Sequence, residues 1–169
     1  MADTRNKPFS DPVMQALAAC LSRYARSGET VTVGYSGGLD STVLLHASNR
    51  HAADAGLRLS ALHVNHGLSP NADAWADSCR RVCEQLSIPL IVRRVEVPAR
   101  SGEGIEAAAR RLRHKALAKH SADWILLAHH ADDQAETVLH NLLRGSGVRG
   151  AAAMPAVRGR ILRPLLGLG

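Results

Sequence analysis

Short apolar segments alternate with longer amphipathic ones along most of the chain. Residues 30–35 form a β-branched run that is short enough for a buried strand, and a helical stripe follows them to about Asn49. Further strands are predicted at 57–64, 89–97 and 124–128, and further helices at 10–27, 71–86, 105–120 and 131–143. This alternation predicts an α/β domain with an open, mainly parallel sheet and helices on both faces.

The last part of the chain has a different composition. Beyond Gly145 it is rich in glycine, arginine and proline, and only residues 160–166 look strand-like. A length of 169 residues fits one domain. We therefore expect a single domain over 1–169, with its core at about 11–145 and a basic tail at 146–169 that leads towards further domains.

Charge and cysteine content give limited information about the partners and the cellular compartment of the protein. The formal charge of +6 suits a polyanionic partner such as nucleic acid, although many small enzymes are equally basic. No apolar run is long enough for a membrane span and the N-terminus does not resemble a signal peptide, so we expect a cytoplasmic protein without a membrane partner. The three cysteines, Cys20, Cys79 and Cys83, are expected to be free thiols.

A glycine-containing loop joins the first buried strand to the helix that follows it. It consists of Ser36, Gly37, Gly38, Leu39, Asp40 and Ser41. Glycines let consecutive N–H groups point at one anion, and the start of a helix adds positive dipole at the same place. The loop therefore predicts a phosphate site, but it matches neither the Walker A nor the dinucleotide pattern. Taken alone, it could also be an ordinary strand-to-helix turn.

Acidic residues crowd the start of the helix at 131–143. Asp133 and Glu136 have the spacing of a capping box, which is a purely structural role. Together with Asp132 they exceed what capping requires, and they follow a strand, where an open parallel sheet places its ligands. The expected apolar stripe, which includes Val138 and Leu142, lies on the opposite side of this helix. Carboxylates can then project into a cleft.

Two other groups of residues could have either a functional or a purely structural role. A zinc site is conceivable from His63, His66, Cys79 and Cys83, but the two cysteines belong to an apolar helical stripe, which favours buried thiols. Glu106 and Arg110 lie one helical turn apart and could form a surface ion pair. The zinc interpretation is the weaker one for the first group.

Several blocks of sequence resemble known proteins. Residues 36–41 match the signature of the PP-loop family of N-type ATP pyrophosphatases, which implies an adenine nucleotide alpha hydrolase-like fold. Four further blocks resemble the tRNA(Ile)-lysidine synthetases in the same order, namely 63–68, 104–110, 128–137 and 143–147. The resemblance covers nearly the whole chain, from about 30 to 166.

The resemblance implies an activity and a set of site residues. ATP, with Mg²⁺, would adenylate the wobble cytidine of isoleucine tRNA with a CAU anticodon, and the amine of L-lysine would then displace AMP. Residues 36–41 would bind the ATP phosphates, Asp40 would be a magnesium ligand and catalytic residue, and Arg110 would contact a nucleotide phosphate. His129, Asp133 and Glu136 would serve lysine binding and catalysis. The resemblance also suggests a homodimer.

The chemistry leaves some choices open. Lysine must lose a proton before it attacks, and spacing does not identify the base, for which Asp133 is the first choice. His114 stands where the family usually has tyrosine. Five arginines after the last helix could face tRNA or simply be solvated, namely Arg144, Arg149, Arg158, Arg160 and Arg163. Residues 1–169 alone are expected to bind ATP but to modify tRNA poorly.

Three rival functions have different requirements. A tRNA thiolase would need reactive cysteines at the cleft, whereas Cys79 and Cys83 fall in a helical stripe. An amidotransferase-linked synthetase would need a glutaminase motif, and none is evident. A non-catalytic nucleotide sensor would keep the loop and lose the acids, whereas this sequence retains Asp40, Asp133 and Glu136.

Overall fold

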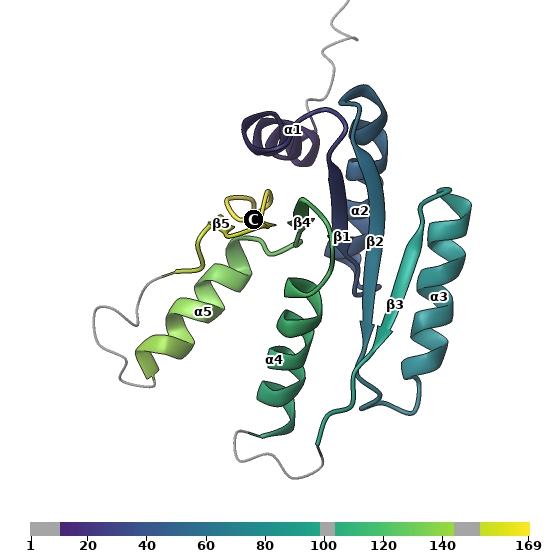
Figure 1. The fold of residues 1–169 in the computed structure, drawn as a ribbon. Coiled ribbons are helices and arrows are strands. Elements are labelled where there is room, and N and C mark those ends of the chain that lie inside the picture. The colour runs from purple at the N-terminus through teal and green to yellow at the C-terminus, as the bar shows by residue number, and fades with distance from the viewer. Residues whose placement is uncertain (1–10, 99–103, 144–152) are drawn as a thin grey trace, which may run out of the picture.

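The chain forms one six-stranded sheet flanked by helices (Figure 1). The computed structural model describes residues 11–98, 104–143 and 153–169. The strands are β1 (Thr30–Gly34), β2 (Arg58–Asn65), β3 (Leu90–Arg94), β4 (Trp124–Leu126), β5 (Val157–Arg158) and β6 (Ile161–Leu162). The helices are α1 (Pro12–Tyr24), α2 (Leu39–Asp54), α3 (Ala72–Gln85), α4 (Ile105–Ala118) and α5 (Ala131–Leu143).

The strand order is β3-β2-β1-β4-β6-β5, and only the β5–β6 pair is antiparallel. The predicted fold class is therefore confirmed. The order reverses between β1 and β4, since the chain moves outward from β1 to β3 and then returns to the other side. In open α/β sheets such a reversal leaves a crevice at the carboxyl ends of the strands, where ligands bind.

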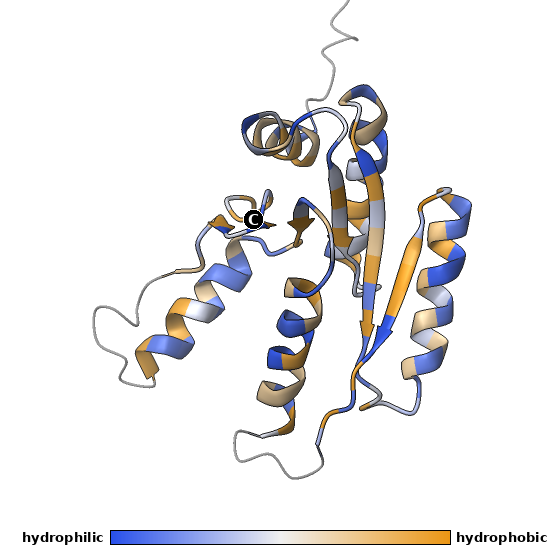
Figure 2. Ribbon diagram, viewed as in Figure 1, coloured by the Kyte–Doolittle hydropathy of each residue, from blue (hydrophilic) through white to orange (hydrophobic). Residues whose placement is uncertain are grey.

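Alternate strand residues face two separate apolar cores. On one face Val33 of β1 packs with residues of α1, α2 and α3, including Leu17, Leu44 and Cys79. On the other face Leu117 of α4 packs against the sheet in a smaller cluster, formed by Leu62, Leu117, Ile125 and Leu127. Helices therefore cover both faces. Figure 2 shows β1 banded between hydrophobic and intermediate residues and β3 hydrophobic except at its end, whereas α3 and α4 carry many hydrophilic residues.

Some predicted boundaries differ from the observed ones. The first helix ends at Tyr24, before the predicted end at residue 27, and the helix after the glycine loop continues to Asp54, beyond Asn49. The third strand ends at Arg94 because the chain leaves the sheet before residue 97. Asp11 accepts backbone N–H bonds at the start of α1. The sequence Ser10-Asp11-Pro12 is typical of a helix N-cap, and Asp11 has that role in the structure. Ser10 lies outside the described residues, as do Gly145 and Gly147, which the sequence favours as the end of the last helix.

The segment expected to be a tail contributes to the sheet and to the core. Residues 160–166 do not form one strand; Gly159, at φ +58°, turns the chain between β5 and β6. Leu162 is fully buried and Leu165 is 5% exposed. The core therefore extends past the predicted limit at 145. The two separate strands were not predicted, because a strand of two residues shows no recognisable alternation in the sequence.

Helix α5 is attached mainly by its first turns. The N–H of Ala131 donates to the carbonyl of Leu168 at 2.8 Å, and the Gln134 amide exchanges two hydrogen bonds with the backbone of Met154. The expected apolar stripe is not covered by the rest of the described chain: no residue of α5 is buried, and Leu142 is 57% exposed. In the part of the chain that the structure describes, no helix has the length and apolarity needed to cross a bilayer.

Candidate nucleotide site

The glycine loop lies at the carboxyl end of β1, in the middle of the sheet. Gly37 has φ +86°, a conformation that L side chains rarely adopt. A Cβ atom on Gly37 would lie 2.9 Å from the Sγ atom of Cys79. Both the backbone conformation and the close approach of α3 therefore require glycine here.

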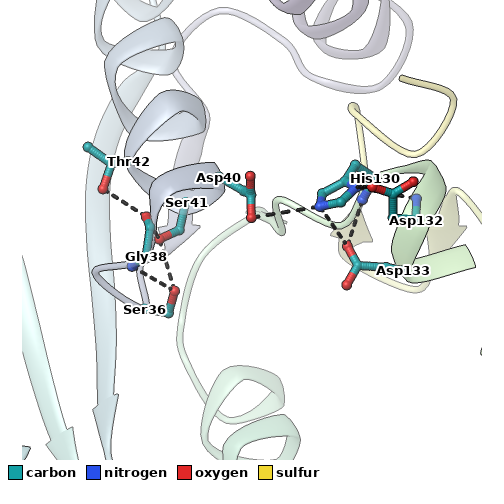
Figure 3. Close-up of polar contacts among 8 residues, drawn as sticks. All are labelled: Ser36, Gly38, Asp40, Ser41, Thr42, His130, Asp132 and Asp133. Atoms are coloured by element: carbon teal, nitrogen blue, oxygen red, sulfur yellow. Dashed lines mark hydrogen bonds and ion pairs between the residues drawn. The ribbon is translucent and has the colours of Figure 1, made fainter. Parts of the chain in front are cut away.

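Hydroxyl groups hold the loop in shape. The Ser41 and Thr42 hydroxyls donate to the carbonyl of Gly38 at 3.0 and 2.9 Å. The Ser36 hydroxyl lies 2.9 Å from that of Ser41 and accepts from the N–H of Gly38 at 3.3 Å (Figure 3). No side chain caps α2, so the N–H groups of its first turn remain available. Such a helix start is suited to binding a phosphate.

The start of α5 faces the loop. The Nε2 atom of His130 lies 3.7 Å from a carboxylate oxygen of Asp40 and 3.7 Å from one of Asp133 (Figure 3). The Asp133 carboxylate accepts from the N–H of His130 at 2.9 Å, and His130 Nδ1 accepts from the N–H of Asp132 at 3.3 Å. These reciprocal bonds form a capping box with His130 as the cap. The Asp133–Glu136 capping box, which the sequence offered as a structural alternative, is not the pairing that the structure shows.

His129, the residue before the cap, is only partly exposed. Burial lowers its pKa to about 4, and the charge of Arg163 acts in the same direction while Asp133 opposes it. Its Nδ1 atom is buried and has no hydrogen-bond partner among the described residues. At neutral pH the imidazole is therefore uncharged, and one nitrogen is left without a protein partner.

One face of α4 supplies positive charge. Arg110, Arg113 and His114 line the same cavity as the loop. Burial lowers the pKa of Arg113, and the neighbouring Arg110 lowers it further. Burial and the surrounding arginines likewise lower the pKa of His114. His114 is therefore neutral beside fixed positive charges.

A cavity of about 380 Å³ joins these elements. Its lining includes seven of the predicted site residues: Ser36, Gly38, Asp40, Ser41, Arg110, His129 and Asp133. Gly37 and Leu39 belong to the loop but are absent from this lining, and the Leu39 side chain is 78% exposed. Glu136 is exposed one turn further along α5 and is absent from the lining as well.

Sequence reasoning missed several lining residues. Arg113 could have been found, because it lies one helical turn from Arg110 on the same face of α4. Asn65 belongs to the resembling block 63–68 but was given no role, and Trp75 gave no signal, since only the fold brings α3 to the cavity. His130 is absent from the lining, but it lies 3.7 Å from Asp40, and sequence reasoning assigned it no role beside His129.

The possible zinc ligands show a different arrangement. His63 Nδ1 donates to the Tyr35 carbonyl at 2.9 Å and lies 3.5 Å from Cys79 Sγ. Burial raises the pKa of Cys79 to about 11, which opposes the thiolate form that a metal needs. Within residues 11–98, 104–143 and 153–169, no three His, Cys, Asp or Glu side chains are grouped as a metal site.

The sheet is mainly parallel, and at the point where its strand order reverses a glycine loop leads into a helix whose start has no side-chain cap. These features define an α/β nucleotide-binding domain. The family comparison identifies the class more closely: the chain belongs to the PP-loop domain family, whose model matches residues 10–169.

Two curated relatives share one name. The chain is 58% identical over 140 residues to the tRNA(Ile)-lysidine synthase of Alkalilimnicola ehrlichii, covering 79% of this chain and 32% of that protein. It is 51% identical over 169 residues to the tRNA(Ile)-lysidine synthase of Azoarcus sp. strain BH72, covering 96% of this chain and 36% of that protein. The chain thus spans about a third of the length of these relatives.

Solved structures share the fold at low identity. The U34-tRNA thiolase NcsA from Methanococcus maripaludis, with its [4Fe-4S] cluster, has a TM-score of 0.72 and 19% identity, covering 93% of this chain and 59% of that one. The NH3-dependent NAD synthetase from Campylobacter jejuni has a TM-score of 0.58 and 17% identity, covering 94% of this chain and 67% of that one. At these identities the likeness concerns the fold alone.

Proposed function

We propose that this chain is the ATP-using domain of a tRNA(Ile)-lysidine synthase. In the proposed reaction the wobble cytidine of isoleucine tRNA with a CAU anticodon attacks ATP and releases pyrophosphate, and the side-chain amine of L-lysine then displaces AMP. The observation that carries the proposal is the meeting of the glycine loop, Asp40 and Asp133 in one cavity. The names of the curated relatives support the choice of reaction.

The loop residues fit the first step. The free N–H groups at the start of α2 would bind phosphate oxygens, and Arg110 would add a planar pair of donors. The Asp40 side chain is 58% exposed, and carboxylate oxygens are the ligands that Mg²⁺ prefers, so Asp40 would hold it. The metal supplies charge neutralisation on the phosphates.

The acids at α5 fit the second step. The bond from the N–H of His130 holds the Asp133 carboxylate at the cavity wall. There it would bind the lysine ammonium and accept its proton. The positive charges that lower the pKa of His129 and His114 would also lower that of an incoming ammonium. His129 would act as an uncharged hydrogen-bonding group. Glu136, outside the cavity lining, would contribute through charge alone.

The test is AMP and pyrophosphate release with unmodified CAU isoleucine tRNA, with and without lysine, alongside the full-length Azoarcus relative. The expected result is lysine-dependent AMP release and lysine incorporation into the tRNA, slower than with the relative. tRNA-dependent adenylation that ignores lysine would contradict lysine as the nucleophile. Sedimentation of the same sample tests the proposed homodimer.

A tRNA thiolase is the second candidate, because the thiol of Cys79 lies against Gly37 of the glycine loop. Replacing lysine by a sulfur donor in the same assay separates the two functions. Sulfur incorporation in place of lysine would favour the thiolase.

A further inference from the structure

Four arginines from α4, β5 and the segment after β6 are close enough to act on one histidine, His114. Arg110 and Arg113 come from α4, Arg158 from β5, and Arg163 follows β6 directly. Burial lowers the pKa of His114, and the charges of Arg113, Arg110, Arg163 and Arg158 lower it further, so all four guanidinium groups act electrostatically on this side chain. Residues distant in sequence are thus brought together by the parallel pairing of β4 with β6.

Arg163 is unusual within this group because it is buried. It is 5% exposed, and its Nη1 atom donates to the Pro155 carbonyl at 2.8 Å. Its Nε atom is buried and has no hydrogen-bond partner in the described part of the chain. A buried guanidinium with an unused donor carries a desolvation cost that an anion would offset.

The neighbouring strand end also holds an unpartnered group. The N–H of Leu127 donates to the Leu162 carbonyl at 3.0 Å, which places the segment leading to His129 beside Arg163. His129 Nδ1 is the second buried atom there without a described partner. Arg163 Nε after β6 and His129 Nδ1 after β4 are therefore two buried nitrogen atoms without a described hydrogen-bond partner, and they follow neighbouring strands.

The charge of this group is not balanced by nearby carboxylates. Among the described residues, none of the four arginines forms an ion pair, and Asp133 is the acid that acts on the neighbouring His129. Arginine is suited to phosphate because its planar fork can pair with two oxygens.

We propose that Arg113, Arg158 and Arg163 form a second phosphate subsite that takes a backbone phosphate of the nucleic-acid substrate. This inference rests on the proposed function, since it assumes a tRNA substrate. The loop follows β1 and Arg163 follows β6, two strands away, which is a separation of about 10 Å. A phosphate at Arg163 is therefore distinct from one bound by the loop.

The test compares Arg113→Gln and Arg158→Gln with a control, Arg81→Gln on the exposed surface of α3. Arg163 is not substituted, because it is buried and a variant at this position is expected to misfold. The probe is a short hairpin RNA with the CAU anticodon loop, bound at several salt concentrations, and ATP with Mg²⁺ is titrated separately.

The two variants are expected to lose hairpin affinity by about threefold to tenfold and to lower the salt dependence by about one counterion each. ATP affinity should fall less than hairpin affinity, and the control should match the wild type. Unchanged hairpin affinity and salt dependence in both variants would overturn the subsite. An equal or larger loss of ATP affinity would assign the arginines to the ATP phosphates instead. Failure of the proposed function would appear separately, as lysine-independent AMP release by the wild type.

Discussion

The Nε2 atom of His130 lies 3.7 Å from the carboxylate of Asp40, although the two residues are 90 positions apart in the sequence. Asp40 belongs to the first turn of α2 and His130 precedes α5, so the contact joins two helix starts. Both N-termini thereby face one cavity, and their partial positive charges add at the place where phosphate is expected.

His130 has two separable roles, as helix cap and as neighbour of Asp40. We predict that His130→Ser keeps a capping oxygen and changes the free energy of unfolding little, whereas His130→Ala costs about 1 kcal/mol. Both variants should lose ATP affinity by about threefold to tenfold, equivalent to one weak polar interaction. Urea unfolding and calorimetric ATP titration with Mg²⁺ check both effects. Full ATP affinity in the serine variant would show that His130 acts only as a cap.

Gly37→Ala tests the shape of the glycine loop. The added methyl combines a positive φ with a 2.9 Å approach to Cys79 Sγ, so we expect a loss of about 2 kcal/mol or more and a loss of ATP binding. Gly28→Ala is the matched control, because Gly28 has the same φ of +86° and nothing within 4 Å.

The control should cost about 1 kcal/mol through backbone strain and keep its ATP affinity. Thermal unfolding and ATP titration separate the two effects. Equal stability losses in the two variants would show that the contact with Cys79 adds nothing.

Local pattern was sufficient for the elements with strong periodicity. The β-branched run at β1 and the glycine loop after it were predicted because both signals lie within a few residues. The site was predictable only as far as each residue belonged to such a segment. The charge of Arg163 acts on His114 only because the strand order brings them close, and strand order depends on long-range packing. Their spacing in the sequence does not indicate this proximity.

Helix α5 shows what such a pattern leaves open. Its stripe of Val138, Leu139 and Leu142 predicted an apolar face, and Leu139 is 58% exposed. Amphipathicity reports that a face is apolar and does not say what covers it.

His129 should make stability depend on pH. Its pKa is about 4 in the folded chain, below its ordinary value of 6.5, so the unfolded chain binds the proton more tightly. This contribution to stability is complete above pH 6.5 and is lost as the pH falls towards 4. We predict that replacing His129 by Gln reduces the loss of stability between pH 7 and pH 5 by about 2 kcal/mol.

Urea unfolding of wild type and variant at both pH values measures this difference. His63, His114 and His120 also have lowered pKa values, so the wild-type slope alone is not diagnostic. An identical pH dependence in the variant would contradict the burial of a neutral His129.

The cysteines should be unreactive where a thiolase would need them reactive. Burial raises the pKa of Cys79 to about 11 and also raises that of Cys83, so thiolate is scarce at neutral pH. Both side chains are 1% exposed, whereas Cys20 is partly exposed. We predict that iodoacetamide at pH 8 labels Cys20 first and that Cys79 and Cys83 react only on unfolding.

Mass spectrometry of labelled peptides with and without urea measures the order. Substituting Cys79 by Ala should lower stability through the lost packing against α2 and β1 while leaving AMP release dependent on lysine. Rapid labelling of native Cys79, with sulfur transfer abolished by that substitution, would assign the cavity to thiolation, because a thiolate beside the glycine loop is the group that such chemistry requires.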